Sequence, residues 1–402
     1  MRIARVLAAA VLLMSSAALA AVPPKAHGVR HRTHHAAAHR VVRPRTAKAR
    51  PVRPLPKPSV QALAVPQPKP PAIRHVFVIV LENEDYATIF GPDTPSPYLG
   101  HVLPAMGALA TNYYATGHAS LSNYLTMISG QPPSPATIGD CSRYTEFAPT
   151  APLTRQGIAV GNGCVYPASV KTLPDQLEAA HFTWRGYMED MGNDAGREAS
   201  ACARPQIGGD GVLRATATDG YAYRHDPFIY FHAIVDRPAC AANVVRLERL
   251  TEDLKSAAAT PNFSFITPSV CNDGHDQPCA DGRPGGLVAA DAWLKLWVPR
   301  ILASPAFRQD GLLIVTFDEA SRDVTACCNE PAGPNVKAPG RYGPGGGRIG
   351  AVLLSPVIKP GTVIDAPINH YGFLRSVEDI FGLPHLGYAA DPALNTFVPA
   401  TP

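Results

Sequence analysis

The first 74 residues contain no Asp or Glu, although they hold fourteen of the 36 Lys and Arg residues of the chain. The whole 402-residue chain has a formal net charge of +4, so residues 75–402 carry 4 − 14 = −10. Proteins that bind phosphate backbones keep a basic stripe on their folded surface. The acidic body therefore excludes a nucleic-acid-binding core. After the first residues, no apolar run has membrane-spanning length.

The first twenty residues have the pattern of a secretory signal. Arg2 and Arg5 precede an apolar run at residues 6–13, and small residues then lead to Ala18-Leu19-Ala20. The run is too short to span a bilayer, and signal peptidases cleave after such small-x-small patterns. We expect residues 1–20 to be a cleaved signal peptide and the mature protein to be secreted or periplasmic.

The next segment is rich in proline and basic residues. Residues 22–74 hold eleven Pro, twelve Lys or Arg and no carboxylate. Such a chain repels itself and cannot bury enough apolar surface to offset its ordering entropy. We expect residues 21–73 to be a disordered linker that acts as a spacer or as an arm contacting an anionic envelope surface. Nothing there would preorganise its histidines for a metal.

All eight cysteines lie in the acidic body, and their number is even. Disulfides are the default in an oxidising compartment, and no paired C-x-x-C motif supports a zinc site. Proximity in sequence suggests three pairs: Cys141 with Cys164, Cys202 with Cys240, and Cys271 with Cys279. Spacing alone does not choose among about 105 connectivities. Cys327 and Cys328 remain ambiguous.

Apolar runs alternate with helical patterns along the body. The runs predict buried strands at residues 75–81, 263–267, 312–317 and 349–354. Helical periodicity predicts helices at residues 122–128, 173–180, 244–258, 286–302 and 371–381. The alternation predicts an α/β fold with a parallel or mixed sheet between helix layers and a site at the carboxyl ends of the strands. The irregular residues 131–236 are expected to cap the sheet, which leaves residues 74–402 as a single catalytic domain.

Polar side chains follow two of the predicted strands. Glu82 and Asn83 come directly after the first, and Asp318 and Glu319 directly after a later one. Strand ends converge in a parallel sheet, and oxygen donors suit a hard or borderline divalent cation. Acidic residues at strand ends also serve solubility or helix capping. Two such pairs after buried strands favour a metal site.

Small and polar residues lead into the predicted helix at residues 122–128, so Ser120 lies at or near its N-terminus. The helix dipole and free N–H groups there stabilise both an alkoxide and a bound phosphate. Most serines at such positions are only N-caps. As a nucleophile, Ser120 or Ser122 would need activation by a metal ion or a neighbouring base.

Several blocks of sequence keep one order along residues 74–388. They are residues 75–83 with Tyr86, H-A-S-x-x-N-Y at 118–124, W-R-G-Y-M-E-D-M at 184–191, Y-R-H-D-P-F at 223–228, T-P-S-V-C-N-D-G-H-D at 267–276, T-F-D-E at 316–319 and N-H-Y at 369–371. Together they resemble the phosphoesterase family of secreted acid phosphatases and phospholipases C, part of the alkaline-phosphatase-like superfamily. Any one block would be weak; their shared order makes the resemblance specific.

The resemblance implies an alkaline-phosphatase-like αβα sandwich with a central, mostly parallel sheet and one divalent metal ion of unknown identity. It also implies that Ser120, not Ser122, is the nucleophile and that Asn123, one helical turn away, donates to a phosphate oxygen. The implied metal ligands are Glu82, Asn83, Ser120, Asp318 and Glu319. A second metal is not expected, because this chain has Asn83 and Glu319 where two-metal relatives carry additional Asp and His ligands.

Three histidines are further candidates. His275 lies in a turn between Asp273 and Asp276, from which it could protonate the leaving group or bind a phosphate oxygen. His225 resembles a substrate-contacting histidine of the family, and His118 could support Ser120. Each has a structural alternative, as a packed or surface histidine.

The predicted function is metal-dependent hydrolysis of phosphate monoesters through a phosphoserine, as in acid phosphatases. A phospholipase C or other phosphodiesterase is the alternative within the family. A Ser-His-Asp esterase built from Ser120, Asp318 and His370 lacks a G-x-S-x-G elbow. A non-catalytic envelope-binding protein would not need Glu82, Ser120, Asn123 and Asp318 together. We expect a small phosphorylated substrate and no nucleic acid; the oligomeric state is not indicated.

Overall fold

The computed structural model describes residues 73–337 and 343–397. The predicted signal peptide and all but the last residue of the predicted linker lie outside these ranges. Within them, no helix combines the length and the apolar character needed to cross a membrane.

An eight-stranded sheet forms the centre of the fold, in the order β11-β2-β10-β9-β1-β8-β6-β7. Five neighbouring strands are parallel: β9 (Gly311–Phe317), β1 (His75–Leu81), β8 (Phe263–Thr267), β6 (Trp184–Met188) and β7 (Val244–Arg246). Next to them, β10 (Ala351–Leu354) runs antiparallel to β9 and to β2 (Ala108–Ala110), and β11 (Thr362–Ile364) runs parallel to β2. The predicted α/β fold with a mostly parallel central sheet is confirmed.

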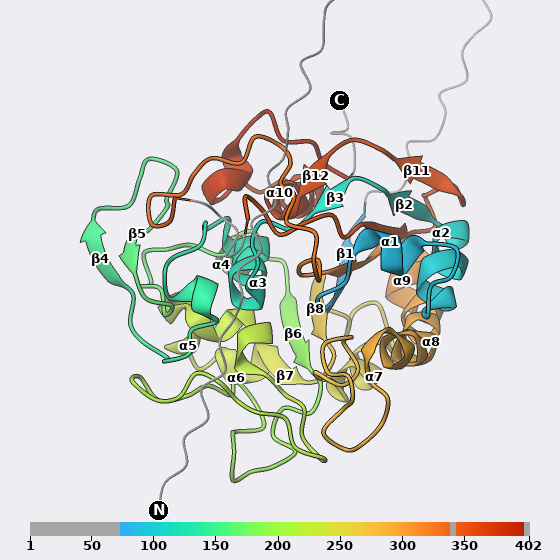
Figure 1. Ribbon diagram of the computed structural model, residues 1–402, viewed down its shortest axis with the longest axis horizontal. Helices are drawn as coiled ribbons and strands as arrows, with labels where there is room; N and C mark the ends of the chain where they lie inside the picture. Colours follow the sequence, from blue (N-terminus) through green and yellow to red (C-terminus); the bar gives the residue numbers. More distant parts are fainter. Residues whose placement is uncertain (1–72, 338–342, 398–402) are drawn as a thin grey trace, which may run out of the picture. The chain divides into compact units, whose positions relative to one another are not determined.

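Helices cover both faces of this sheet (Figure 1). On one side lie α3 (Ser120–Ser129), α4 (Leu173–Ala179) and α10 (His370–Phe381), and on the other α8 (Gly286–Ala303) and α9 (Pro305–Asp310). Every residue of β1, β8 and β9 is buried as a result. Strands covered on both faces read as continuous apolar runs, which is why these three are visible in the sequence.

The remaining elements are short. They are α1 (Tyr86–Phe90), α2 (Leu103–Met106), α5 (His232–Val235), α6 (Cys240–Asn243) and α7 (Arg249–Asp253), the π-helical η1 (Tyr98–Val102), the 3-10 turns η2 (Thr137–Gly139), η3 (Tyr223–His225), η4 (Pro227–Tyr230) and η5 (Gly387–Ala390), and the strand pairs β3 (Tyr113–Tyr114) with β12 (Ile368–Asn369) and β4 (Ala148–Ala151) with β5 (Val160–Asn162).

Two of the predicted elements are wrong. The helix expected at residues 244–258 begins instead with β7, whose β-branched Val244 and Val245 pair with β6, and only α7 is helical. The segment 131–236 does more than cap the sheet, because it contributes β6. This strand reads W-R-G-Y-M and lacks β-branched residues. Its Gly186 lies so close to the Phe228 ring that a Cβ there would be 2.5 Å from it.

All eight cysteines are paired in the structure. The bonds Cys141–Cys164, Cys202–Cys240 and Cys271–Cys279 confirm the three predicted pairs, and the adjacent Cys327 and Cys328 form the fourth. Four disulfides are typical of proteins that fold outside the cytoplasm.

Candidate functional site

The structure brings the two predicted acidic pairs together at one edge of the sheet. Because β1 and β9 pair in parallel along their whole length, the residues that follow them leave the sheet side by side. Asn83 links the pairs: its backbone N–H donates to Asp318 Oδ1 (3.2 Å), and its side-chain amide donates to Glu82 Oε2 (2.7 Å). Glu82 and Asp318 are fully buried, and Glu319 is 7% exposed. Asn83 adopts a left-handed backbone (φ 55°), which Asn tolerates better than most residues.

The hydroxyl of Ser120 faces this acidic pair. Ser120 is the first residue of α3, and its Oγ donates to Glu82 Oε2 across 2.9 Å. Ala119, and not a serine, occupies the N-cap position. Ser122 turns away, because its Oγ donates to the backbone carbonyl of Ala119. The structure thus distinguishes the two serines by their contacts, since only the Ser120 hydroxyl reaches Glu82. The role of Ser120 as the nucleophile stays a prediction.

Asn123 braces the loop before α3. Its Oδ1 accepts hydrogen bonds from the backbone N–H groups of Thr116 (3.1 Å) and Gly117 (2.9 Å). Its Nδ2 donates to Glu319 Oε2 (3.0 Å) and to the Gly117 carbonyl (2.8 Å). To donate to a phosphate oxygen, Asn123 Nδ2 would have to give up its hydrogen bond to Glu319. The role of Asn123 as a donor to the substrate stays a prediction.

A histidine and a further carboxylate lie on the other side of Glu82. His225, from η3, places Nε2 3.3 Å from Glu82 Oε1 and Nδ1 3.2 Å from Asp273 Oδ2. The His225 ring stacks on Tyr124 of α3, with centroids 5.4 Å apart. Asp273 lies in the turn after β8 and accepts the backbone N–H of His275. Sequence reasoning missed Asp273 as a site residue; the available signal was an acidic residue in the turn after a third buried strand.

Glu82, Asp318, Glu319, Asp273 and His225 together form a cluster of buried polar side chains. The carboxylates of this cluster have raised pKa values. Burial raises the pKa of Glu82, Asp273 and Glu319 well above their usual range, and the charge of nearby Asp318 raises it further. Burial also raises the pKa of Asp318 to about 7. Burial lowers the pKa of His225 well below its usual range, which favours a neutral imidazole. Ionised carboxylates in this position therefore require compensation by positive charge.

Four buried atoms of the cluster have no hydrogen-bond partner among the described residues: Glu82 Oε1, Asp318 Oδ2, Asp273 Oδ2 and His225 Nε2. Buried polar atoms are normally paired, and leaving them unpaired is costly. Ligand atoms of Glu82, His225 and Asp273 lie within 4.8 Å of one another. Carboxylate oxygens and a neutral imidazole are donors that divalent cations accept. The group Glu82, His225 and Asp273 fits a metal ion, and it shares Glu82 with the implied ligand set.

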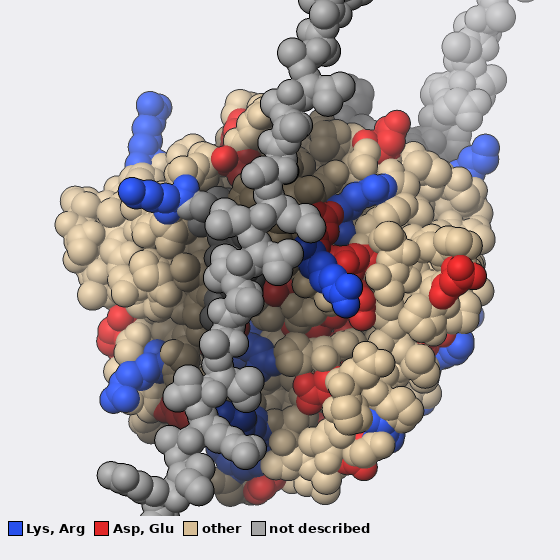
Figure 2. Space-filling view, viewed as in Figure 1, with Lys and Arg blue, Asp and Glu red and all other residues tan. Residues whose placement is uncertain are grey.

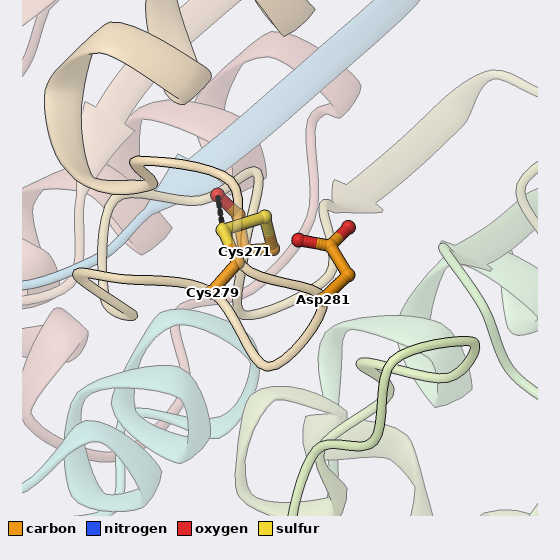
Figure 3. A group of neighbouring side chains, drawn as sticks. All are labelled: Cys271, Cys279 and Asp281. Atoms are coloured by element: carbon orange, nitrogen blue, oxygen red, sulfur yellow. Dashed lines mark hydrogen bonds between the residues drawn. A yellow bond between two sulfur atoms is a disulfide. The ribbon is translucent and has the colours of Figure 1, made fainter.

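A second group of potential ligands, Cys271, Cys279 and Asp281, does not form a metal site. Its two sulfur atoms are joined in a disulfide, as Figure 3 shows. Because metals bind thiolates, these sulfur atoms are not available as ligands. The bond instead closes the loop after β8, which carries His275.

The other predicted histidines lie around the cluster. His118 is buried, with Nε2 2.7 Å from the Asp323 carbonyl oxygen and Nδ1 3.9 Å from Glu319 Oε1. His275 lies at the solvent boundary and is 37% exposed. His118 therefore contacts a carboxylate of the cluster, and its support of Ser120 stays a prediction.

His370 supports the end of β9. Its ring nitrogens lie 2.6 Å from the Tyr113 hydroxyl and 2.6 Å from the main-chain carbonyl of Asp318. Because both nitrogens are engaged there, a Ser120–His370–Asp318 triad is not formed.

On the face shown in Figure 2, acidic side chains gather in a hollow near the centre, with Lys or Arg side chains at its rim. This region lies over β1 and β8 in the view of Figure 1.

A model of the phosphoesterase family matches residues 101–384. A probable acid phosphatase of Kluyveromyces lactis is 27% identical over 322 residues, which are 79% of this chain and 60% of that protein. An acid phosphatase of Aspergillus fumigatus is 25% identical and covers 79% of this chain and 56% of that protein. The chain thus spans less than two thirds of the length of these fungal relatives.

A phosphatidylinositol-3-phosphatase of Mycobacterium tuberculosis is 25% identical and covers 80% of this chain and 81% of that protein. Among solved structures, a protein in the alkaline phosphatase superfamily from Vibrio parahaemolyticus matches with a TM-score of 0.46 and 13% identity, covering 77% of this chain and 67% of that one.

Proposed function

The chain belongs to the phosphoesterase family, and we propose that it is an acid-phosphatase-like enzyme that hydrolyses phosphate monoesters through a phosphoserine at Ser120. The observation that carries this proposal is the Ser120 hydroxyl, which begins a buried helix and donates to Glu82 Oε2 across 2.9 Å. The names of the relatives, acid phosphatase and phosphatidylinositol-3-phosphatase, both denote removal of a phosphate monoester. They favour this activity over the diester cleavage of a phospholipase C.

In the proposed reaction, Ser120 Oγ attacks phosphorus and gives its proton to Glu82 Oε2, its acceptor in the structure. The Oγ–P bond forms as the P–O bond to the alcohol breaks, and the departing oxygen takes a proton from water or from an acid at the site. Water then hydrolyses the phosphoserine, which restores Ser120 and releases inorganic phosphate. The free N–H groups at the start of α3 stabilise negative charge at this position.

We propose that Glu82, Asn83, Ser120, Asp318 and Glu319 hold one divalent cation, with His225 and Asp273 as additional donors. When bound, the cation supplies positive charge that stabilises the phosphoryl oxygens. The buried oxygens of Glu82 and Asp318 that accept no hydrogen bond from the described residues support this assignment.

The proposal is tested with the purified full-length chain on three substrates: p-nitrophenyl phosphate, bis(p-nitrophenyl) phosphate and phosphatidylcholine. We expect turnover of the monoester to exceed that of both diesters, to be lost on dialysis against EDTA and to return with a divalent metal. A preference for either diester would point to a phosphodiesterase. Activity that survives EDTA would instead point to a metal-free serine hydrolase.

The covalent intermediate has a separate test. Acid quenching during turnover of p-nitrophenyl phosphate, followed by mass spectrometry, is expected to show phosphate on the peptide that contains Ser120. Absence of the phosphopeptide under burst conditions would favour direct attack by water.

We further propose that the mature enzyme acts outside the cytoplasm, where its basic N-terminal segment contacts an anionic envelope surface. The four disulfides support the compartment. N-terminal sequencing of exported protein is expected to begin at Ala21, and deletion of residues 22–73 should release the enzyme from envelope fractions.

A further inference from the structure

Arg224 has no acidic partner among the described residues, unlike two other arginines of the chain. Arg185 and Arg197 form ion pairs with Asp253 and Asp219. No ion pair joins Arg224 to a carboxylate within residues 73–337 and 343–397. Its guanidinium instead lies against an imidazole, with Nη2 3.3 Å from His275 Nε2. A half-buried cation without a counterion is in a position to bind an anion.

Turn η3 places Arg224 beside the carboxylate cluster. The next residue, His225, points inward and lies 3.3 Å from Glu82. Burial raises the pKa of Glu82 and Asp273, and the charge of Arg224 opposes that rise at both groups. The guanidinium is therefore near the cluster in space as well as in sequence.

His275 fixes the orientation of this guanidinium. Because a guanidinium only donates, His275 Nε2 accepts from Arg224, and Nδ1 donates to Asp276 Oδ1 across 2.8 Å. The Cys271–Cys279 disulfide closes the loop that carries both His275 and Asp276. In this arrangement Nε2 of His275 carries no proton for a leaving group. The Asp276 carboxylate holds the imidazole of His275 in place, and the imidazole in turn holds the guanidinium of Arg224.

We propose that Arg224 binds the phosphoryl group of the substrate and selects dianionic monoesters over monoanionic diesters, with His275 and Asp276 as positioning residues. This inference rests on the proposed phosphatase function. Carboxylates around Ser120 repel anions, and each additional negative charge on the substrate increases that repulsion. A guanidinium binds two oxygens of a phosphate side by side. A diester presents one charge fewer, and its second ester group replaces one of the charged oxygens.

The first experiment compares Arg224→Gln with the wild-type chain on p-nitrophenyl phosphate and bis(p-nitrophenyl) phosphate. Loss of a charge-assisted bidentate contact is expected to lower kcat/KM for the monoester by about 100-fold and for the diester by about threefold or less. Arg283→Gln is the matched control, because Arg283 lies a few residues beyond the disulfide-closed loop, is exposed and pairs with Asp281. It is expected to leave both values unchanged. Equal losses on the two esters in Arg224→Gln would overturn the inference.

The second experiment tests the positioning role of His275. A Gln at this position retains an acceptor for Arg224, whereas an Ala does not. We expect His275→Ala to raise KM for the monoester by about tenfold with a smaller change in kcat, and His275→Gln to restore most of the difference. If His275 were instead the acid for the leaving group, both variants would lose kcat alike, and the positioning role would be refuted.

The third measurement separates this inference from the proposed function. Calorimetric titration with inorganic phosphate needs no turnover and is expected to show at least tenfold weaker binding to Arg224→Gln than to the wild-type chain. If the wild-type chain hydrolyses neither ester but shows this difference, the proposed function fails and the Arg224 site stands. If it hydrolyses the monoester and phosphate binds both chains equally, the function stands and the Arg224 site fails.

Discussion

The two ends of the central strands differ in how their charges are balanced. At the amino end, His75 begins β1, and its Nδ1 lies 2.5 Å from Oδ1 of Asp310, the residue that precedes β9. Both side chains are largely buried, and each is the partner of the other. At the carboxyl end, the residues that follow the same two strands are Glu82 and Asp318, each with a buried oxygen that accepts no hydrogen bond in the described part of the chain.

The difference shows which end serves stability and which serves binding. A balanced buried pair is complete without a ligand, whereas a group of buried like charges costs folding free energy until a ligand compensates it. Unpaired polar atoms of this kind concentrate at functional sites. Substitutions at the two ends should therefore have opposite consequences, and the following predictions test this.

We call the amino end, with the pair His75 and Asp310, the balanced end, and the carboxyl end, with Glu82 and Asp318, the unbalanced end. The largest effect on activity is expected at Ser120, whose hydroxyl contacts Glu82 at the unbalanced end. Ser120→Ala removes the proposed nucleophile and should lower kcat for p-nitrophenyl phosphate by about 10⁴-fold or more. Ser122→Ala on the same helix is the matched control, because its hydroxyl donates only to the Ala119 carbonyl. Both variants should retain the far-ultraviolet circular dichroism of the wild-type chain. Substantial activity in Ser120→Ala would refute the nucleophile assignment.

The next effect concerns cation affinity. Asp318→Asn keeps an acceptor for the backbone N–H groups of Asn83 and Glu319 but removes a charge. Affinity for a divalent cation should fall by about 100-fold, as measured by competition with a chelating dye. Asp310→Asn removes a buried carboxylate at the balanced end and should leave the affinity unchanged. Equal cation affinity in the two variants would break the distinction between the ends.

The unbalanced end should also make stability depend on pH in the metal-free protein. Burial raises the pKa of Asp318 to about 7, above its unfolded value of about 3.9. The folded state therefore holds this proton more tightly, so the free energy of unfolding should fall as the pH rises from about 4 to about 7. Burial raises the pKa of Glu330 to about 8 and of Glu378 to about 9, which gives a slope of the same sign.

The contribution of Asp318 is the difference between the wild-type chain and Asp318→Asn, measured by urea unfolding in EDTA. The wild-type chain should lose about 2–4 kcal/mol more than the variant between pH 4 and pH 8. A saturating divalent cation should abolish this difference in slope, because it stabilises the ionised carboxylates. Parallel pH profiles of the two metal-free proteins would contradict the prediction.

The site residues that directly follow strands were predictable, because their position depends only on where each strand ends. Buried parallel strands appear as continuous apolar runs, so the residue directly after β1 or β9 must lie at the carboxyl edge of the sheet. Glu82 and Asp318 needed no further information. Ser120 followed from the start of a helix, although only the resemblance separated it from Ser122.

The loop half of the site was not predictable from periodicity. Arg224 lies within a long irregular segment, and Asp273 lies in a turn several residues beyond β8. Tertiary contacts and the Cys271–Cys279 bond decide which side chains Arg224 and Asp273 contact. The same holds for β6, since its W-R-G-Y-M sequence becomes a strand through packing of Gly186 against Phe228. Asn123 was placed correctly on α3, but its bonds to the loop before the helix depend on where that loop folds.

The smallest effect on function is expected at the balanced end. Asp310→Asn replaces the carboxylate that faces His75 by a neutral amide and should lower the free energy of unfolding by about 2 kcal/mol, because a short charge-assisted contact is lost in a buried place. The kcat and KM for p-nitrophenyl phosphate should stay at wild-type values, since the pair lies a strand length away from Ser120. Asp365→Asn is the control, because Asp365 is exposed. A loss of activity larger than the loss of folded protein would mean that the amino end also shapes the site, and the division between a stabilising end and a binding end would have to be abandoned.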